Sequence, residues 1–190
     1  GELLAKLILE TQDPVVFIEN KAQYLLQLQT DAQLQDFVVE EVYESTDQQQ
    51  RFPVRTVEVK GAPHPACTIA AYGYMSELCL QAMHKLAFEH EQFCRLVIPT
   101  KLSPFDVGTL AESTARTGYL VTVEEGTRTS GWGAEVATRC AEQLGAKLKG
   151  VRRVAAKDTP VPAALTLETG TLPQVDNIVD AVRKLAGKNG

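Results

Sequence analysis

The residues of this chain that could do chemistry gather in two short loops. The first is GTRTSGWGAEV, in which Gly126, Gly131 and Gly133 precede an amphipathic run. The first N–H groups of a helix have no intrahelical partner, so this loop can bind an anion, with help from Arg128. Its spacing matches neither GxGxxG nor the GxxxxGK[ST] phosphate loop. Three interpretations stay open: an anion site, a packing turn, or a subunit-contact loop anchored by Trp132.

The second loop is KDTPVPAA, which contains Asp158, Thr159, Pro160 and Pro162. The Asp158 carboxylate can accept a hydrogen bond from a nearby backbone N–H, and because Pro160 has none, we expect Val161 to be the donor. A loop stiffened by two prolines also loses little entropy when a partner binds. The segment is therefore interpreted as a local turn or as a partner-docking loop.

Catalytic residues are hard to assemble from this sequence. None of the three histidines, at 64, 84 and 90, has a serine, cysteine or carboxylate at a spacing that would indicate a catalytic pair, and we expect them to be solvated. Two acidic pairs could suggest acid–base work, Glu40-Glu41 in a polar stretch and Glu124-Glu125 at the end of an expected strand. No nucleophile, base and orienting group combine, so we expect no catalytic residue here.

Cysteine usage indicates packing rather than chemistry. The four cysteines are Cys67, Cys79, Cys94 and Cys140, and none forms a CxxC pair. Without clustered ligands we expect no metal site. We interpret the four as reduced thiols facing the core of a cytosolic type of protein.

Composition limits the function classes. The chain has 190 residues, 44% of them hydrophobic, and a net charge of −5, which argues against nucleic acid as a partner. No apolar run approaches the roughly 18 residues of a membrane span, and no small-residue cleavage site of a signal peptide follows the start. We therefore expect a cytoplasmic protein without a membrane partner.

Hydrophobic patterns predict the elements that position the two loops. Apolar runs predict strands, and amphipathic runs predict helices. The expected strands are 14–18, 54–59, 67–72, 93–98, 119–123 and 151–155, and the expected helices are 2–9, 76–89, 106–116, 134–144 and 172–186. We expect Asp106 and Thr171 to cap two of these helices and Gly118 to end one. The alternation predicts a three-layer α/β/α fold with a mostly parallel sheet of about five strands.

Seven segments, taken together and in order, resemble one family. They are PVVFIENK (14–21), TIAAYGYM (68–75), PTKLSPFD (99–106), TGYLVTVEEG (117–126), GWGAEVA (131–137), RVAAKDTPVPAA (153–164) and LPQVDNIVDAVRKL (172–185). The family is the beta subunit of the thiamine-dependent decarboxylating component of 2-oxo acid dehydrogenase complexes, which act on pyruvate, branched-chain 2-oxo acids or acetoin. More distantly, the chain is similar to the carboxyl-terminal domain of transketolase and deoxyxylulose-phosphate synthase.

The resemblance implies a division of the chain. Residues 1–13 would end the preceding pyrimidine-binding domain. Residues 14–66 would form a junction strand and a Gln-rich arm, and residues 67–190 a transketolase-type carboxyl-terminal domain. The cofactor glutamate and the active-site histidine of the family would lie upstream of Gly1. The parent enzyme would use thiamine diphosphate and magnesium, whereas this fragment would bind no cofactor. Residues 24–66 depart from the family pattern, which also leaves open a parent with fused alpha and beta regions.

The resemblance also implies a function in assembly. The parent would be an oxidoreductase that decarboxylates a 2-oxo acid and transfers the acyl group to lipoamide, in the cytoplasm or, in a eukaryote, in the mitochondrial matrix. Its partners would be the alpha subunit, a second beta subunit and the dihydrolipoyl acyltransferase core, and we expect a dimer contact near Trp132. Two alternatives are a domain of a transketolase-class enzyme and a regulatory module that binds an anionic metabolite at the Gly126–Gly133 loop.

Overall fold

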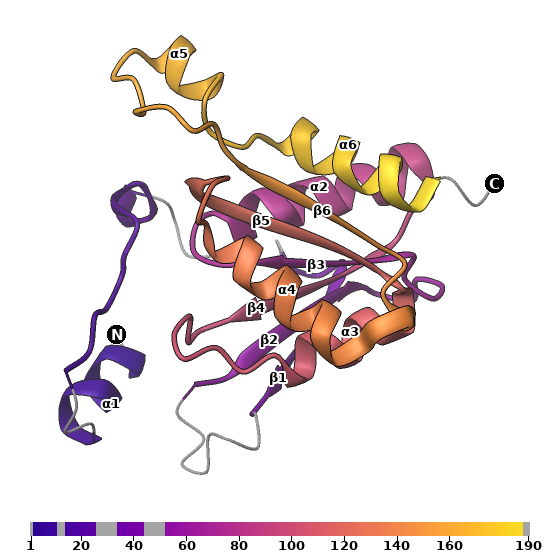
Figure 1. Ribbon diagram of the computed structural model, residues 1–190, viewed down its shortest axis with the longest axis horizontal. Helices are drawn as coiled ribbons and strands as arrows, with labels where there is room; N and C mark the ends of the chain where they lie inside the picture. The colour runs from indigo at the N-terminus through magenta and orange to yellow at the C-terminus, as the bar shows by residue number, and fades with distance from the viewer. Residues whose placement is uncertain (1, 11–13, 26–33, 44–51, 188–190) are drawn as a thin grey trace.

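A six-stranded sheet forms the centre of the protein (Figure 1). The computed structural model describes residues 2–10, 14–25, 34–43 and 52–187. The strands are β1 (Phe37–Val42), β2 (Val54–Val59), β3 (Cys67–Ala71), β4 (Cys94–Pro99), β5 (Tyr119–Thr127) and β6 (Gly150–Ala156), in the order β1-β2-β4-β3-β5-β6. The four strands from β4 to β6 are parallel, while β2 pairs antiparallel with β4 and with β1.

Helices cover both faces of the sheet and complete the three layers. On one face α2 (Met75–His90) and α6 (Val175–Ala186) enclose a cluster that includes Ile69, Leu96 and Ile178, none of which is exposed to solvent. On the other face α3 (Gly108–Thr117) and α4 (Trp132–Leu144) pack over Ala70 and Leu120. The short 3-10 helix η2 (Gly145–Lys147) follows α4. The predicted α/β/α class is confirmed, with six strands rather than five.

The amino-terminal part differs from prediction. α1 (Glu2–Glu10) and the 3-10 helix η1 (Lys21–Leu25) stand beside the sheet, but the predicted strand at 14–18 is irregular and exposed. An apolar run needs a partner strand, and none pairs with it in the described part of the chain. Conversely FVVEEV, in the stretch predicted as an arm, forms β1 and displaces β2 from the edge. Much of the Gln-rich stretch, 26–33 and 44–51, lies outside the described residues.

Two helix starts also need correction. α6 begins at Val175 rather than in the 172–173 region, and its cap is Gln174, which exchanges hydrogen bonds with Asn177 in a capping box. Thr171, the predicted cap, instead donates its hydroxyl to the Leu167 carbonyl at 2.8 Å. Leu167 belongs to a short helix that the sequence patterns missed, α5 (Leu165–Thr169). At α3, Asp106 does accept a hydrogen bond from Gly108 N at 2.9 Å, although the capping residue itself is Val107.

The four cysteines behave as predicted. All are free and buried. Burial raises the pKa of Cys94 to about 12 and that of Cys140 to about 11, and it also raises the pKa of Cys67 and Cys79. Because the thiolate is the reactive form, these thiols are inert packing groups.

Candidate functional site

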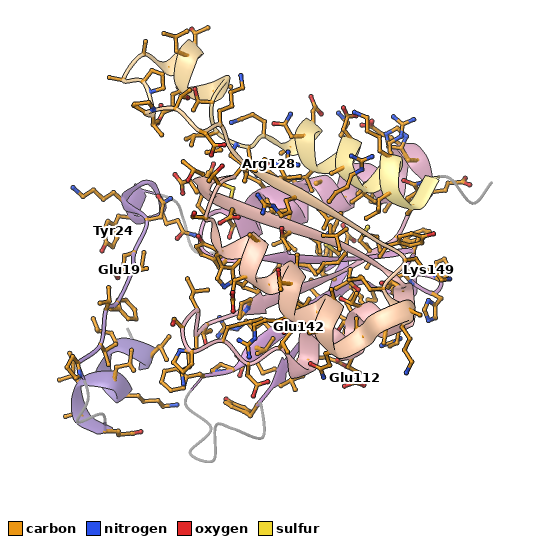
Figure 2. The ribbon with its side chains drawn as sticks, viewed as in Figure 1. Glu19, Tyr24, Glu112, Arg128, Glu142 and Lys149 are labelled. Atoms are coloured by element: carbon orange, nitrogen blue, oxygen red, sulfur yellow. The ribbon has the colours of Figure 1, made fainter. Side chains whose placement is uncertain are left out.

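The structure places the first predicted loop at the carboxyl end of β5, the region where α/β folds collect ligands. Gly126 belongs to β5 itself, which continues to Thr127. Arg128 lies in the turn, Gly131 caps α4, and both Trp132 and Gly133 belong to the first turn of that helix. Figure 2 labels Arg128 at this end of the sheet. The loop therefore brings the predicted residues together, but over a shorter turn than expected.

A carboxylate of the chain itself occupies the start of α4. Glu124, in β5, is only 1% exposed, and its Oε1 accepts a hydrogen bond from Gly133 N at 2.9 Å. Its Oε2 has no hydrogen-bond partner in the described part of the chain. The first N–H groups of a helix favour negative charge, and here an internal anion provides it. This arrangement favours packing over binding of an external anion at the same N–H groups.

The glycines of the loop make room for that carboxylate. A Cβ at Gly131 would lie 2.4 Å from the Thr127 carbonyl oxygen and 2.6 Å from Glu124 Oε1. A Cβ at Gly133 would lie 2.4 Å from Thr122 Oγ1 and 2.8 Å from Glu124 Oε1. All four of these carbon–oxygen distances are shorter than van der Waals contact. Glycine is thus required at 131 and 133 for close approach of β5 and α4.

Two opposing effects act on the Glu124 carboxyl group. Burial raises its pKa, and the N–H groups of Gly133 and Trp132 and the charge of Arg153 act in the opposite direction without cancelling the rise. The pKa of the neighbouring Tyr72 is also raised, first by burial and then by Glu124 and Glu125. Glu125 is exposed and accepts a hydrogen bond from Asn20 Nδ2 at 2.9 Å. The adjacent acids therefore have different environments.

Trp132 packs into the domain rather than standing on its surface. Its ring contacts Tyr72 edge-to-face at a centroid distance of 5.0 Å, and Phe105 in the same manner at 5.5 Å. The residue is only partly exposed, and its indole Nε1 is buried. This geometry stabilises the α4 start. An additional role at an interface stays a prediction.

The second predicted loop touches the first. Asp158 accepts hydrogen bonds from Thr129 N at 2.9 Å and from Thr129 Oγ1 at 2.8 Å, so the expected donor, Val161, was wrong. These bonds, and then the charges of Arg128 and Arg153, lower the pKa of Asp158. The sequence patterns missed this pairing because 29 residues separate the partners.

After β6 the chain forms a projecting hook, residues 157–171, that carries Thr159, Pro160, Pro162 and α5. It leaves the sheet after β6 and returns where Lys157 N donates to the Thr171 carbonyl at 3.1 Å (Figure 1). Three large apolar side chains are exposed on it: Val161 at 52%, Leu165 at 75% and Leu167 at 60%. An exposed apolar group of this kind suits contact with another protein.

The comparisons with known proteins agree with this architecture. A model of the family described as "Transketolase, C-terminal domain" matches residues 56–178. The chain belongs to the transketolase C-terminal domain family. This confirms the more distant of the two resemblances and the expected fold.

Two curated relatives of this transketolase C-terminal domain are beta subunits of the pyruvate dehydrogenase E1 component. The chain is 31% identical over 186 residues to the pyruvate dehydrogenase E1 component subunit beta of Rhizobium meliloti, covering 97% of this chain and 37% of that protein. It is 31% identical over 188 residues to the mitochondrial subunit beta of Drosophila melanogaster, covering 97% and 47%. The chain thus spans less than half the length of these relatives, and the resemblance to E1 beta subunits is confirmed.

A solved structure is also similar to this domain. It is described as "Split gene transketolase, inactive beta4 tetramer" and superposes with a TM-score of 0.58 at 28% identity, covering 66% of this chain and 41% of the other. That protein is a tetramer of beta chains by its own description. The match supports the transketolase-like fold.

The remaining polar candidates of the domain lie apart from one another. His84 is exposed near Asp36, with Nε2 and Oδ2 at 3.8 Å, and His64 Nδ1 lies 3.1 Å from the Pro65 carbonyl. Glu41 pairs with Arg55 at 2.9 Å on the β1–β2 edge. In the described ranges no group of three or more histidine, cysteine, aspartate or glutamate side chains could hold a metal, and no helix is long and apolar enough to cross a membrane.

Proposed function

We propose that this chain is the assembly domain of the beta subunit of a thiamine diphosphate-dependent 2-oxo acid dehydrogenase. The parent oxidoreductase decarboxylates a 2-oxo acid and transfers the acyl group to lipoamide. Residues 1–13 end the preceding domain, residues 14–66 join it to the carboxyl-terminal domain, and residues 67–190 form that domain. Several relatives are named mitochondrial, so in a eukaryote the parent works in the mitochondrial matrix, and otherwise in the cytoplasm.

One observation carries the proposal: nearly the whole chain matches E1 beta subunits, yet it spans only 37–47% of the two relatives described above. The polar groups gathered at the carboxyl end of β5 support a structural role, since Glu124 holds the start of α4 and Asp158 holds Thr129. The cofactor glutamate and the active-site histidine belong to the upstream part of the parent. Thiamine diphosphate and magnesium bind there.

The hook is the surface we assign to assembly. A second beta subunit, the alpha subunit and the dihydrolipoyl acyltransferase core are the proposed partners. Leu165 and Leu167 are more exposed than the indole of Trp132, which packs inward, so the contact involves the hook rather than Trp132 alone. Prolines 160 and 162 reduce the entropy lost on docking.

Light scattering after size-exclusion chromatography tests assembly. We expect a mass of twice 20.8 kDa at high protein concentration. Leu165→Lys with Leu167→Lys should give the monomer, because a buried charge without a partner is costly. Phe88→Lys, which alters an equally exposed apolar residue on α2, is the matched control and should stay dimeric. A monomeric wild type at every concentration would contradict assembly through this domain.

Calorimetric titration with thiamine diphosphate and magnesium tests the assignment of the cofactor site. We expect no binding specific to the cofactor: thiamine diphosphate with magnesium should bind the 190-residue chain no tighter than inorganic pyrophosphate does, because the residues that hold the cofactor lie elsewhere in the parent. Saturable binding of thiamine diphosphate that is much tighter than that of pyrophosphate would overturn the assignment.

A transketolase-class parent is the second candidate, supported by the similarity to the split-gene transketolase. The order of the TKLSPFD and GWGAEV segments favours the dehydrogenase. Assay of the full-length parent distinguishes the two, since only a transketolase transfers ketol units between sugar phosphates.

A further inference from the structure

A large polar cleft runs along the free edge of the sheet. It is bounded by the edge strand β6, by the turn at 169–173 and by one face of α6 from its first to its last turn, and its volume is about 1040 Å³. Figure 1 shows β6 and α6 side by side below the hook. Clefts of roughly 300–1,000 Å³ hold small organic ligands, so this one is large enough for a nucleotide or a sugar phosphate.

The cleft is lined by an excess of positive charge. Its basic residues come from the β5–α4 turn, from β6, from the residue after β6 and from α6: Arg128, Arg152, Arg153, Lys157 and Lys184. Its two carboxylates are already paired, Asp180 with Lys184 at 3.5 Å and Asp176 with Lys85 at 2.8 Å. The net charge of the whole chain is −5, so a positively charged cleft is opposite in sign to the chain as a whole.

Four of these cations have no ion-pair partner within the described ranges: Arg128, Arg152, Arg153 and Lys157. The Arg153 guanidinium donates to the Arg128 carbonyl, which holds the two residues together. Asp158 and Glu124 are the nearby carboxylates: the charges of Arg128 and Arg153 act on Asp158, and the charge of Arg153 acts on Glu124, so these acids offset part of the positive charge. No salt bridge or charge interaction involves Arg152 or Lys157 within the described ranges, so their positive charge remains available to a ligand.

We propose that this cleft binds a phosphate-bearing small molecule. Guanidinium groups donate in pairs to phosphate oxygens, and such charge-assisted bonds are about twice as strong as neutral ones. Thr169, Gln174 and Asn177 line the same space. The Thr169 hydroxyl already donates to the Leu165 carbonyl, and Gln174 and Asn177 bond each other in the capping box, so they form a polar wall beside the cations. The site is distinct from the start of α4, which Glu124 fills. It also does not depend on the proposed parent reaction, because every residue of the cleft belongs to this chain.

Titration of the 190-residue chain with inorganic pyrophosphate tests the site. We expect one saturable site at physiological salt. Arg128→Gln with Arg152→Gln should weaken binding by about tenfold or more, since two charge-assisted contacts are lost. The matched control removes two charges elsewhere, Lys60→Gln with Arg116→Gln, and should change the affinity less than about twofold, because exposed charges at a distance are screened by salt.

Two outcomes of this titration would overturn the proposal. Absence of saturable binding, or equal weakening in the control, would overturn the site and leave the assembly function untouched. Tighter binding of oligoglutamate than of pyrophosphate would overturn the phosphate assignment in favour of an acidic protein segment. If pyrophosphate binds as expected, ADP and glucose 6-phosphate in the same titration identify whether a nucleotide or a sugar phosphate fits the rest of the cleft.

Discussion

Replacing Gly131 with alanine is expected to lower the free energy of unfolding of this domain by about 2–3 kcal/mol, in the range for overpacking a close contact. The added Cβ would lie 2.4 Å from the Thr127 carbonyl oxygen and within 2.7 Å of both Glu124 carboxylate oxygens. The carbonyl is backbone of β5 and the carboxylate is held by the start of α4, so neither moves away freely. The backbone at Gly131 is ordinary, with φ at −74°, so the effect comes from the contact and not from strain.

Urea unfolding followed by circular dichroism measures the change. Gly170→Ala is the matched control, because a Cβ there would lie no closer than 3.5 Å to its neighbours, and its midpoint should stay near that of the wild type. Equal midpoints for Gly131→Ala and wild type would show that β5 and α4 are not closely packed and that the loop keeps space for an external ligand. That result would restore the anion-site interpretation of the loop.

Periodicity was enough to predict the parallel part of the fold. The runs that became β3, β4, β5 and β6 are short and apolar, and each is followed by an amphipathic or turn segment. β1 could not be found this way, because FVVEEV is exposed along most of its length and is a strand only because β2 pairs with it. Residues 14–18 are the opposite case: they are apolar, but no strand within the described ranges pairs with them, and they form no strand. Pairing between distant segments, not local pattern, decides both cases.

The site was predicted at the level of the loop but not of its chemistry. Three glycines ahead of a helix indicated either an anion-binding site or close packing. In the structure the two occur together, because the Glu124 carboxylate is the anion bound at the helix start and the glycines pack against it. The acid was considered as a catalytic candidate because it lies at the end of an apolar strand. Its partner, Gly133 N, is nine residues away, and no spacing rule connects a strand carboxylate to the helix that follows it. The one sequence signal for this contact was the group of glycines, 126, 131 and 133, that closely follows Glu124.

Glu124→Gln is expected to flatten the pH dependence of folding stability. Burial raises the pKa of Glu124 in the folded state above its unfolded value of about 4.3. The folded chain then binds this proton more readily than the unfolded chain, so the contribution to stability is full below the unfolded pKa and is lost as pH rises through the raised folded pKa. Asp158 has the opposite sign: its lowered pKa gives stability that is lost in acid. The two groups therefore act in different parts of the pH range.

Unfolding free energies of wild type and Glu124→Gln, measured from pH 4 upward, isolate this one carboxyl group, because every other titration is common to both. The difference should grow in favour of the glutamine variant as pH rises, since glutamine keeps an acceptor for Gly133 N without a buried charge. Glu124→Ala should instead cost about 2–3 kcal/mol at neutral pH, because it leaves a buried N–H without an acceptor. Glu125→Gln, which alters the exposed neighbour, should run parallel to wild type. A difference between wild type and Glu124→Gln that does not vary with pH would mean that the carboxylate is as well stabilised inside the domain as in water, and that its place at the start of α4 outweighs its burial.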